Sequence, residues 1–367
     1  MGTIIDYVER RGSVPLSAQP LGEVDALVLS YLAYMPMGGI VGEAFDGGIP
    51  LSQVAQSLLS CGACARIVGE RHARDRRLLA ALKKSARFGT MRATGFVERY
   101  NEDIQEQFCA VTFLYGDEAF AAYRGTDGTL VGWKEDFNMS FAREVPAQRS
   151  AMRYAQEALM KLRRPMTLGG HSKGGNLAAY AALFAGEQVR KSVRLAYNFD
   201  GPGFNEAVAA RRARSEAARI RTFVPQGSIV GMLLWHSEPF TLVQSDGTGL
   251  LQHDPLTWQV MGGRFVPADR RTLGSRFADA TIKDWLLNLP EATRRKAIDG
   301  IYEIVSAGGD RTVEELLDAP HFFAMLRAAV GMDGETRRAI EEMLALLGVA
   351  AAEAAAEGVA RIGRMDG

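Results

Sequence analysis

A serine crowded by glycines constrains the fold of this 367-residue chain more than any other feature. The sequence Gly170-His171-Ser172-Lys173-Gly174 fits the pattern G-x-S-x-G, with an apolar run before it and the alanine-rich residues 174–186 after it. Apolar residues followed by strong helix formers predict a strand, a tight turn and a helix. In such a turn the glycines let strand and helix approach closely, and the serine hydroxyl stands exposed at the helix N-terminus. The pattern therefore predicts Ser172 as a nucleophile; a glycine-rich turn without chemistry is the alternative interpretation.

The pattern of apolar residues changes its period along the chain. Alternation typical of strands covers residues 94–100, 108–115 and 118–125, with the turn-forming pair Gly116-Asp117 between the last two. After residue 146 helical and strand patterns alternate, which indicates crossover connections between parallel strands. The predicted helices cover residues 147–162, 174–186 and 204–220, and the predicted strands cover residues 166–170, 193–199, 220–225 and 240–245. We therefore predict an α/β-hydrolase fold, with a mixed, mostly parallel sheet and helices on both faces.

Three regions follow from these patterns. Residues 1–90 have helical periodicity, including an apolar face at 24–34 and a basic stretch at 71–87. They are expected to pack on the core or cap it. Residues 91–265 are the predicted α/β core, and residues 266–367 form a helical C-terminal extension that ends in an alanine- and glutamate-rich tail.

Composition narrows the classes of function. The 43 basic and 43 acidic residues give a formal net charge of zero, which argues against nucleic acid as a partner. The N-terminus lacks a basic segment followed by an apolar one, and no run reaches the roughly 18 apolar residues of a membrane span, so we expect a cytoplasmic protein. Cys61, Cys64 and Cys109 make an odd count without a second ligand pair, so we predict neither a disulfide framework nor a metal site.

A serine nucleophile needs a histidine base. The chain has five histidines, and in α/β-hydrolases the base comes after the serine and the acid in chain order. That order leaves His236, His253 and His321 as candidates. We predict His253 as the base because it follows the expected strand at 240–245, and His236 is the second choice.

The remaining groups are an acid and an oxyanion hole. Asp200 stands between an apolar strand pattern and Gly-Pro-Gly, so it is predicted as the acid, with Asp246 and Asp254 as alternatives. One oxyanion donor is expected from the backbone N–H of Lys173, the residue after the nucleophile. The other is expected from Thr126, which follows an early strand and offers both an N–H and a hydroxyl.

Several motifs together resemble a known family. The sequence Tyr-Arg-Gly-Thr at 123–126, followed by Trp133 and Asp136, resembles the signature of class 3 lipases, and Gly-His-Ser-Lys-Gly-Gly is similar to their nucleophile motif. With the segments at residues 197–204 and 252–258, the set more closely resembles a bacterial, Mbeg-like branch of lipase-like hydrolases. The resemblance runs from about Ile5 to Val260. It implies the same roles for Ser172, His253, Thr126 and Lys173, and it implies no metal or cofactor.

Two positions depart from the lipase pattern. Ser228 stands in the segment where class 3 lipases carry the acid, and Lys173 replaces a usually apolar residue, so we expect its charge beside the site or in solvent. The resemblance implies a serine hydrolase that cleaves an ester or lipid substrate through an acyl-enzyme. A binding protein on a hydrolase scaffold, which the serine at 228 favours, and an acyltransferase are the alternatives. These motifs encode neither the oligomeric state nor the natural substrate and the length of its acyl chain.

Overall fold

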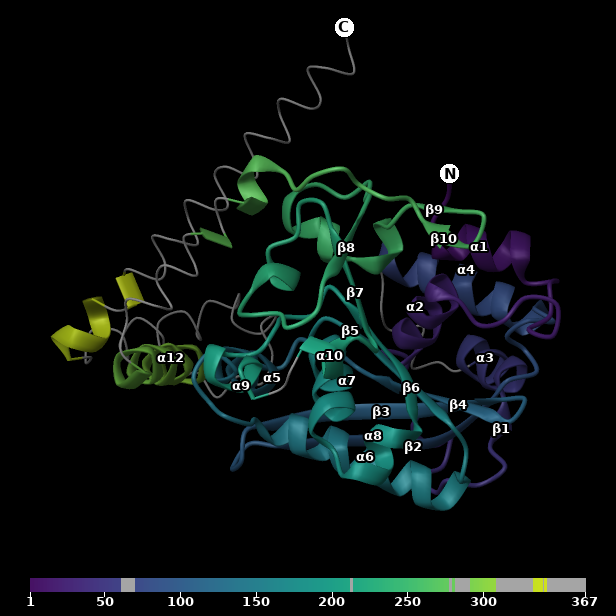
Figure 1. Ribbon diagram of the computed structural model, residues 1–367, viewed down its shortest axis with the longest axis horizontal. Helices are drawn as coiled ribbons and strands as arrows, with labels where there is room; N and C mark the ends of the chain where they lie inside the picture. The colour runs from purple at the N-terminus through teal and green to yellow at the C-terminus, as the bar shows by residue number, and fades with distance from the viewer. Residues whose placement is uncertain are drawn as a thin grey trace, which may run out of the picture.

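The computed structural model describes residues 1–60, 70–211, 214–276, 279–280, 291–307, 333–338 and 340–341 (Figure 1). Within these residues eight strands form one sheet in which spatial neighbours are also neighbours in sequence. The strands are β1 (Ile49–Pro50), β2 (Arg92–Asn101), β3 (Glu106–Tyr115), β4 (Glu118–Tyr123), β5 (Met166–His171), β6 (Val193–Phe199), β7 (Ile220–Pro225) and β8 (Phe240–Val243). A small hairpin, β9 (Val260–Met261) with β10 (Arg264–Phe265), lies outside this sheet.

The sheet is mixed. Pairings are antiparallel from β1 to β4 and parallel from β4 to β8. In register, Tyr123 of β4 lies opposite Gly170 of β5, and His171 of β5 lies opposite Phe199 of β6. The carboxyl ends of β4, β5 and β6 therefore share one edge, where ligands bind in open α/β sheets. The predicted α/β-hydrolase fold with a mixed sheet is confirmed, and β1 is a strand that the sequence patterns did not indicate.

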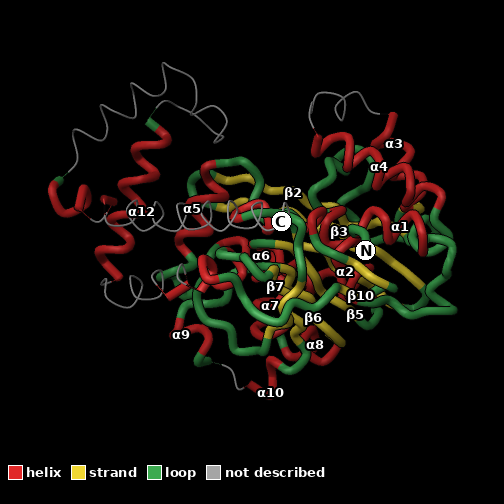
Figure 2. Tube along the Cα trace, turned by 90° about the horizontal axis from the view of Figure 1, so that it is seen from above, coloured by secondary structure: helices red, strands yellow, loops and turns green. Residues whose placement is uncertain are grey.

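Helices cover both faces of the sheet (Figure 2). On one face lie α6 (Pro146–Leu162) and α7 (Lys173–Phe184), which contact β3 and β4 to β6 respectively. The opposite face is covered by α2 (Glu23–Leu32), nine of whose ten residues are buried. Such an all-round apolar helix belongs to the interior of a protein. The N-terminal segment is therefore a full layer of the core.

The outer N-terminal helices are joined to α2 by a buried ion pair. Helix α1 (Ile4–Arg11) contacts α2 and α4 (Glu70–Lys84), and α4 contacts α3 (Leu51–Ser60). Arg87, which follows α4, makes two hydrogen bonds to Asp25 of α2, and the hydroxyl of Tyr7 donates to the same carboxylate. Both members of the ion pair are 1% exposed. Arg87 lines the same hollow as Thr167 and Leu195, which lie where β5 and β6 begin, and among the described residues the pair has no hydrogen bond to a candidate site residue.

The segment between β6 and β7 differs from the prediction. The single helix expected over residues 204–220 is wrong, because the described part contains two short helices, α9 (Glu206–Ala209) and α10 (Arg214–Ala217). Asn205 caps α9 by accepting a hydrogen bond from the N–H of Val208. Burial of Val208 and Ala217 in the sheet core takes precedence over the helix propensity of the alanines and arginines.

The C-terminal region is described only in part. Helix α12 (Glu291–Ser306) packs on α5 (Leu130–Asn138), where Lys134 forms an ion pair with Asp299 (Figure 1). Most of the predicted extension 266–367 lies outside the described residues, as do Cys61, Cys64 and His321. In the described part of the chain no helix is both long and apolar enough to cross a membrane.

Candidate active site

Ser172 occupies the turn between β5 and α7, and its backbone is strained. Its φ is +58° and its ψ is −133°, values that a non-glycine residue adopts only under constraint. The constraint comes from tight packing of the glycines on either side. A methyl group on Gly170 would lie 2.2 Å from the carbonyl carbon of Gly174, and one on Gly174 would lie 2.1 Å from the carbonyl oxygen of Tyr123. The turn thus holds Ser172 at the N-terminus of an α-helix, where the helix dipole favours negative charge.

Asp200 and His253 form a buried pair at the adjacent strand end. Asp200 follows β6, is fully buried and has a φ of +53°. Its Oδ2 lies 2.7 Å from Nδ1 of His253, the last residue of the 3-10 helix η3 (Gly249–His253). An ionised carboxylate only accepts, so Nδ1 of the neutral ring carries the proton and Nε2 keeps its lone pair. The side chain of His253 is 27% exposed and therefore accessible from solvent.

The environment of Asp200 sets its charge. Burial raises the pKa of its carboxyl above the ordinary value, and the hydrogen bond and charge of His253 oppose that rise. Contacts with the Ser228 hydroxyl and the Gly231 N–H also lower the pKa. Ser228 therefore lies beside the Asp200 carboxylate, which His253 also contacts. Ser228 is the residue that stands in the segment where class 3 lipases carry the acid.

The alternative acid and base residues have other partners. Both ring nitrogens of His236 are bonded, Nε2 to the Gly231 carbonyl at 2.9 Å and Nδ1 to Glu238 at 3.1 Å. Asp246 accepts a hydrogen bond from Gln259, and Asp254 pairs with Arg74 at 3.2 Å. In the described residues no cluster of His, Cys, Asp and Glu side chains could hold a metal ion.

His171 supports the segment that carries His253, a contact that the sequence did not predict. Its Nε2 lies 2.7 Å from the carbonyl oxygen of His253, and the two rings are in contact, tilted by 37° with centroids 4.5 Å apart. A carbonyl only accepts, so Nε2 is the donor, and the Tyr34 hydroxyl lies 3.0 Å from Nδ1 and 3.3 Å from the His171 carbonyl oxygen. The contact brings His253 next to the serine turn, although no hydrogen bond joins it to Ser172 among the described residues. Such bonds are often loose before substrate binds.

Thr126 lies on the other side of the serine turn. A methyl group on Gly125 would be 2.9 Å from Cβ of Ser172, so the segment after β4 packs directly on the turn. The Thr126 hydroxyl donates to Oδ2 of Asp136 in α5. The sequence suggested that this hydroxyl is available as a second oxyanion donor. In the structure its hydrogen is engaged by Asp136, which leaves the backbone N–H.

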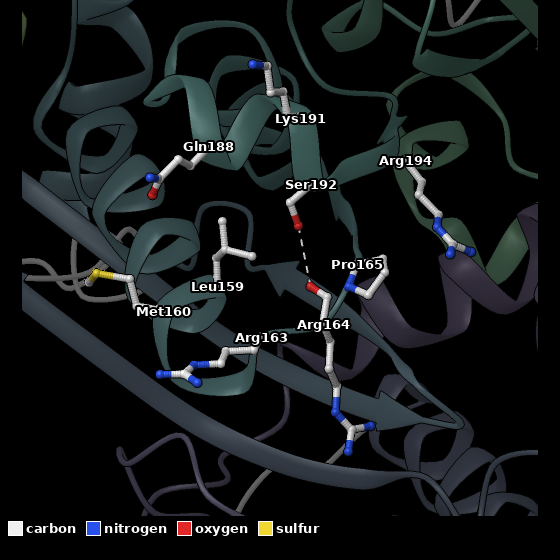
Figure 3. A pocket seen from close by; sticks show the side chains of 9 residues that line it. All are labelled: Leu159, Met160, Arg163, Arg164, Pro165, Gln188, Lys191, Ser192 and Arg194. Atoms are coloured by element: carbon white, nitrogen blue, oxygen red, sulfur yellow. Dashed lines mark hydrogen bonds between the residues drawn. The ribbon is translucent and has the colours of Figure 1, made fainter.

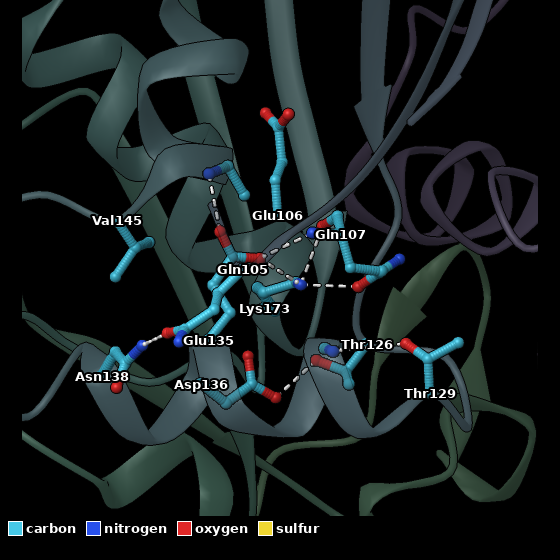
Figure 4. A network of polar contacts seen from close by, with 12 residues as sticks. Gln105, Glu106, Gln107, Thr126, Thr129, Glu135, Asp136, Asn138, Val145 and Lys173 are labelled. Carbon is cyan, nitrogen blue, oxygen red and sulfur yellow. Dashed lines mark hydrogen bonds and ion pairs between the residues drawn. The ribbon is translucent and has the colours of Figure 1, made fainter. Parts of the chain in front are cut away.

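Four consecutive residues of α5 point to four different surroundings, and Figure 4 shows two of them, Glu135 and Asp136. Trp133 is 48% exposed, Lys134 pairs with α12, Glu135 pairs with Lys173, and Asp136 accepts from Thr126. Successive side chains of a helix are separated by about 100°, so one short helix can hold several neighbours at once. The sequence did not indicate partners for Lys134 or Glu135. Only Trp133 and Asp136 stood out, as motif residues.

The expectation for the Lys173 side chain is wrong. It neither reaches solvent nor lines the space above Ser172, because it is 1% exposed and folds back toward β3. Its Nζ lies 2.9 Å from Oε2 of Glu135 and 2.9 Å from the carbonyl oxygen of Gln107, and it also donates to the Gln107 side chain. A buried ammonium must be paired in this way to offset its lost hydration.

Asp136 gives a prediction about stability. Burial raises its pKa to about 6, although Lys173, Thr126 and His253 lower it and Glu135 raises it further. The pKa of Asp136 is higher in the folded than in the unfolded protein. Its contribution to the free energy of unfolding is therefore most favourable below about pH 4 and is lost as pH rises through 6. Asp136→Asn should raise the free energy of unfolding at pH 7 by about 2 kcal/mol and flatten its decline between pH 4 and 6. Urea unfolding at several pH values measures this; equal pH dependence in both proteins would contradict it.

A surface hollow lies at the opposite edge of the sheet (Figure 3). It is formed where β5 and β6 begin, next to Pro165 and Ser192, whereas Ser172 follows the end of β5. Two of its four cationic residues form ion pairs: Arg194 pairs with Glu118, and Lys191 pairs with Glu187. This hollow therefore does not belong to the candidate site.

Comparisons with known proteins identify the family. No curated protein sequence matches the chain. A mutant form of MDLA from Penicillium cyclopium aligns with 60% of this chain and 84% of its own, with 12% identity and a TM-score of 0.33. The Rhizomucor miehei lipase in its propeptide complex aligns with 49% of this chain and 68% of its own, with 15% identity and a TM-score of 0.32. At these TM-scores the likeness supports no argument about function. The family model for Mbeg1-like proteins, in contrast, matches residues 82–303, more than half of the sequence. The chain belongs to the Mbeg1-like family.

Proposed function

We propose that the protein is a serine hydrolase that cleaves a carboxylic ester or lipid acyl substrate through an acyl-enzyme. One observation carries the proposal: a strained serine and a buried aspartate, whose carboxylate lies 2.7 Å from Nδ1 of His253, follow adjacent strands of the sheet. Backbone strain of about 1–3 kcal/mol per residue persists only where surrounding contacts impose it, and it clusters at active sites. Ser172 and Asp200 both have positive φ, at +58° and +53°. The family membership is consistent with this proposal.

In the first half of the proposed reaction Ser172 Oγ attacks the substrate carbonyl carbon. Nε2 of His253 accepts the hydroxyl proton, and Asp200 holds the Nδ1–H tautomer and stabilises the imidazolium. The tetrahedral oxyanion accepts hydrogen bonds from the backbone N–H groups of Thr126 and Lys173. Collapse of this intermediate breaks the ester bond, and His253 returns the proton to the departing alkoxide.

In the second half water replaces the alcohol. His253 takes a proton from water as the oxygen attacks the acyl carbon, and the same two N–H groups stabilise the second oxyanion. Collapse releases the carboxylic acid, and Ser172 recovers its proton from His253. No metal or redox cofactor takes part in these steps.

Exposed apolar side chains on segments that carry site residues favour an apolar acyl group. Leu250 and Leu251, which precede His253, are 64% and 67% exposed, and Trp133 of α5 is 48% exposed. Side chains of this size are usually buried, so several on segments that carry site residues favour an apolar ligand. An acyl chain of several carbons has matching chemistry.

Ester turnover tests the proposal. The purified full chain is mixed with excess p-nitrophenyl butyrate, and release of p-nitrophenol is followed from milliseconds onward. We expect either a burst of about one product per chain or steady turnover that the variants described below abolish. A folded protein with no turnover of acetyl, butyryl or octanoyl esters would contradict the proposal and favour a binding protein.

His171 gives a second prediction. In His171→Phe an aromatic ring still contacts the His253 ring, but the hydrogen bond to the His253 carbonyl is lost. Under the proposed mechanism the base is then less well placed, so kcat should fall about 10-fold with little change in KM. Tyr34→Phe, which removes only the outer hydroxyl, should have a smaller effect in the same direction. An unchanged kcat in His171→Phe would show that the His253 segment holds its position without this bond.

A further inference from the structure

We propose that the buried ion pair between Lys173 and Glu135 positions the two oxyanion donors relative to each other. The inference rests on the proposed function and adds a role for side chains outside the Ser–His–Asp set. The pair joins the first residue of α7 to the middle of α5, which are 38 residues apart in sequence. Lys173 is 1% exposed and Glu135 is fully buried (Figure 4).

Each end of the ion pair lies next to one proposed donor. At one end, the backbone N–H of Lys173 is itself a donor, and its side chain anchors the same residue to Glu135. At the other end, Glu135 is adjacent to Asp136, whose carboxylate accepts from the hydroxyl of Thr126, the second donor. A short path of covalent and hydrogen bonds therefore runs from one N–H to the other through α5.

The polar groups of the pair are well satisfied. Oε1 of Glu135 accepts from the N–H of Ala147 at 2.7 Å, and Oε2 accepts from Lys173 and from the N–H of Gln107. The Lys173 ammonium has three hydrogens, and its three acceptors are Glu135 and two oxygens of Gln107. This leaves no hydrogen of the ammonium for substrate. Lys173 thus acts through its position, while its side chain takes no part in proton transfer.

Energetics support a positioning role. A buried ion pair contributes little net stability compared with apolar residues of similar volume, because desolvation offsets the attraction. Its directional hydrogen bonds, in contrast, fix the position of one backbone relative to the other. Oxyanion donors contribute strongly only at 2.7–3.1 Å from the oxyanion, and a misplacement of about 1 Å can lower a rate about 100-fold.

The test replaces both charges together. Lys173→Met with Glu135→Gln removes the ion pair without leaving a buried charge, and the amide oxygen of the glutamine still accepts from Ala147. We expect this double variant to fold and to lose about 10-fold or more in kcat, with KM within about twofold of wild type. The assay uses a short-chain ester at a temperature well below each melting transition, since loss of stability alone lowers the active fraction rather than kcat per folded chain.

A second buried ion pair provides the matched control. Arg87→Met with Asp25→Asn removes an equally buried pair that, among the described residues, has no hydrogen bond to a candidate site residue. This control should lower the melting temperature and leave kcat within about twofold of wild type. If the first double variant does not fold, Glu135→Asp alone carries the same kcat test, because it keeps both charges and changes only the length of the connection between α5 and Lys173.

The outcomes separate the two proposals. Turnover by wild type with an unchanged kcat in the Lys173–Glu135 double variant would contradict the positioning role alone. Equal kcat losses in both double variants would also contradict it, since the effect would then follow from any lost buried ion pair. Absence of turnover in folded wild type would contradict the proposed hydrolase, and with it this inference.

Discussion

Ser172→Ala is expected to lower kcat for ester hydrolysis by about 10⁴- to 10⁶-fold. The proposed mechanism routes both half-reactions through Oγ of this residue, and removal of the nucleophile in serine hydrolases leaves only the contribution of the oxyanion hole and substrate binding. The melting temperature should change little, because alanine meets the same backbone strain and Oγ has no hydrogen-bond partner among the described residues. Steady-state kinetics with p-nitrophenyl butyrate measure the loss.

A serine at the opposite edge of the sheet is the control for this variant. Ser192 ends α8 (Glu187–Ser192), where its hydroxyl reaches only the carbonyl oxygen of Arg164 at 3.4 Å. Ser192→Ala should keep the full kcat. If Ser172→Ala retained even a tenth of wild-type turnover, another residue would be the nucleophile.

Asp200→Asn is expected to lower kcat by about 10³- to 10⁴-fold with little change in KM. The substitution keeps the size of the side chain and removes the charge that fixes the Nδ1–H tautomer of His253. Since burial raises the pKa of Asp200, the ionised carboxylate opposes folding, and its neutral replacement should not lower the free energy of unfolding at pH 7. Loss of activity without loss of stability distinguishes a catalytic role from a structural one.

Asp246→Asn and Asp254→Asn are the companion variants, since both aspartates were alternative acids. Their carboxylates are engaged by Gln259 and Arg74, so we expect kcat within about threefold of wild type for each. A 10³-fold loss in either, with near-normal activity in Asp200→Asn, would reassign the acid.

Local patterns predicted the fold and the serine turn well. The strand, turn and helix around Ser172 are contiguous, so glycine spacing and helix propensity are sufficient to predict them. The strands of the central sheet were also predicted within a few residues, because each has its own apolar alternation. The short strand β1 has only two residues and no such signal.

Contacts between distant segments were harder to predict. Chain order restricted the base to three histidines, but 53 residues separate Asp200 from His253. Tyr34 lies 137 residues before His171, and no local pattern links an aromatic residue near α2 to the serine turn. The side chain of Lys173 was expected beside the site or in solvent because its partners, Gln107 and Glu135, are 66 and 38 residues away. A lysine directly after the nucleophile was the available signal, since a cation at the start of an apolar helix requires a buried partner.

Covalent labelling with a fluorophosphonate tests the central claim most directly. The reagent phosphonylates a serine only where a base activates it and an oxyanion hole stabilises the intermediate, so it reports the site without requiring the natural substrate. Purified wild-type protein is treated with the probe, digested and analysed by mass spectrometry. The account predicts stoichiometric modification of Ser172, slowed at least 100-fold in His253→Ala. A folded protein that stays unmodified, or is modified at a different serine, would contradict it.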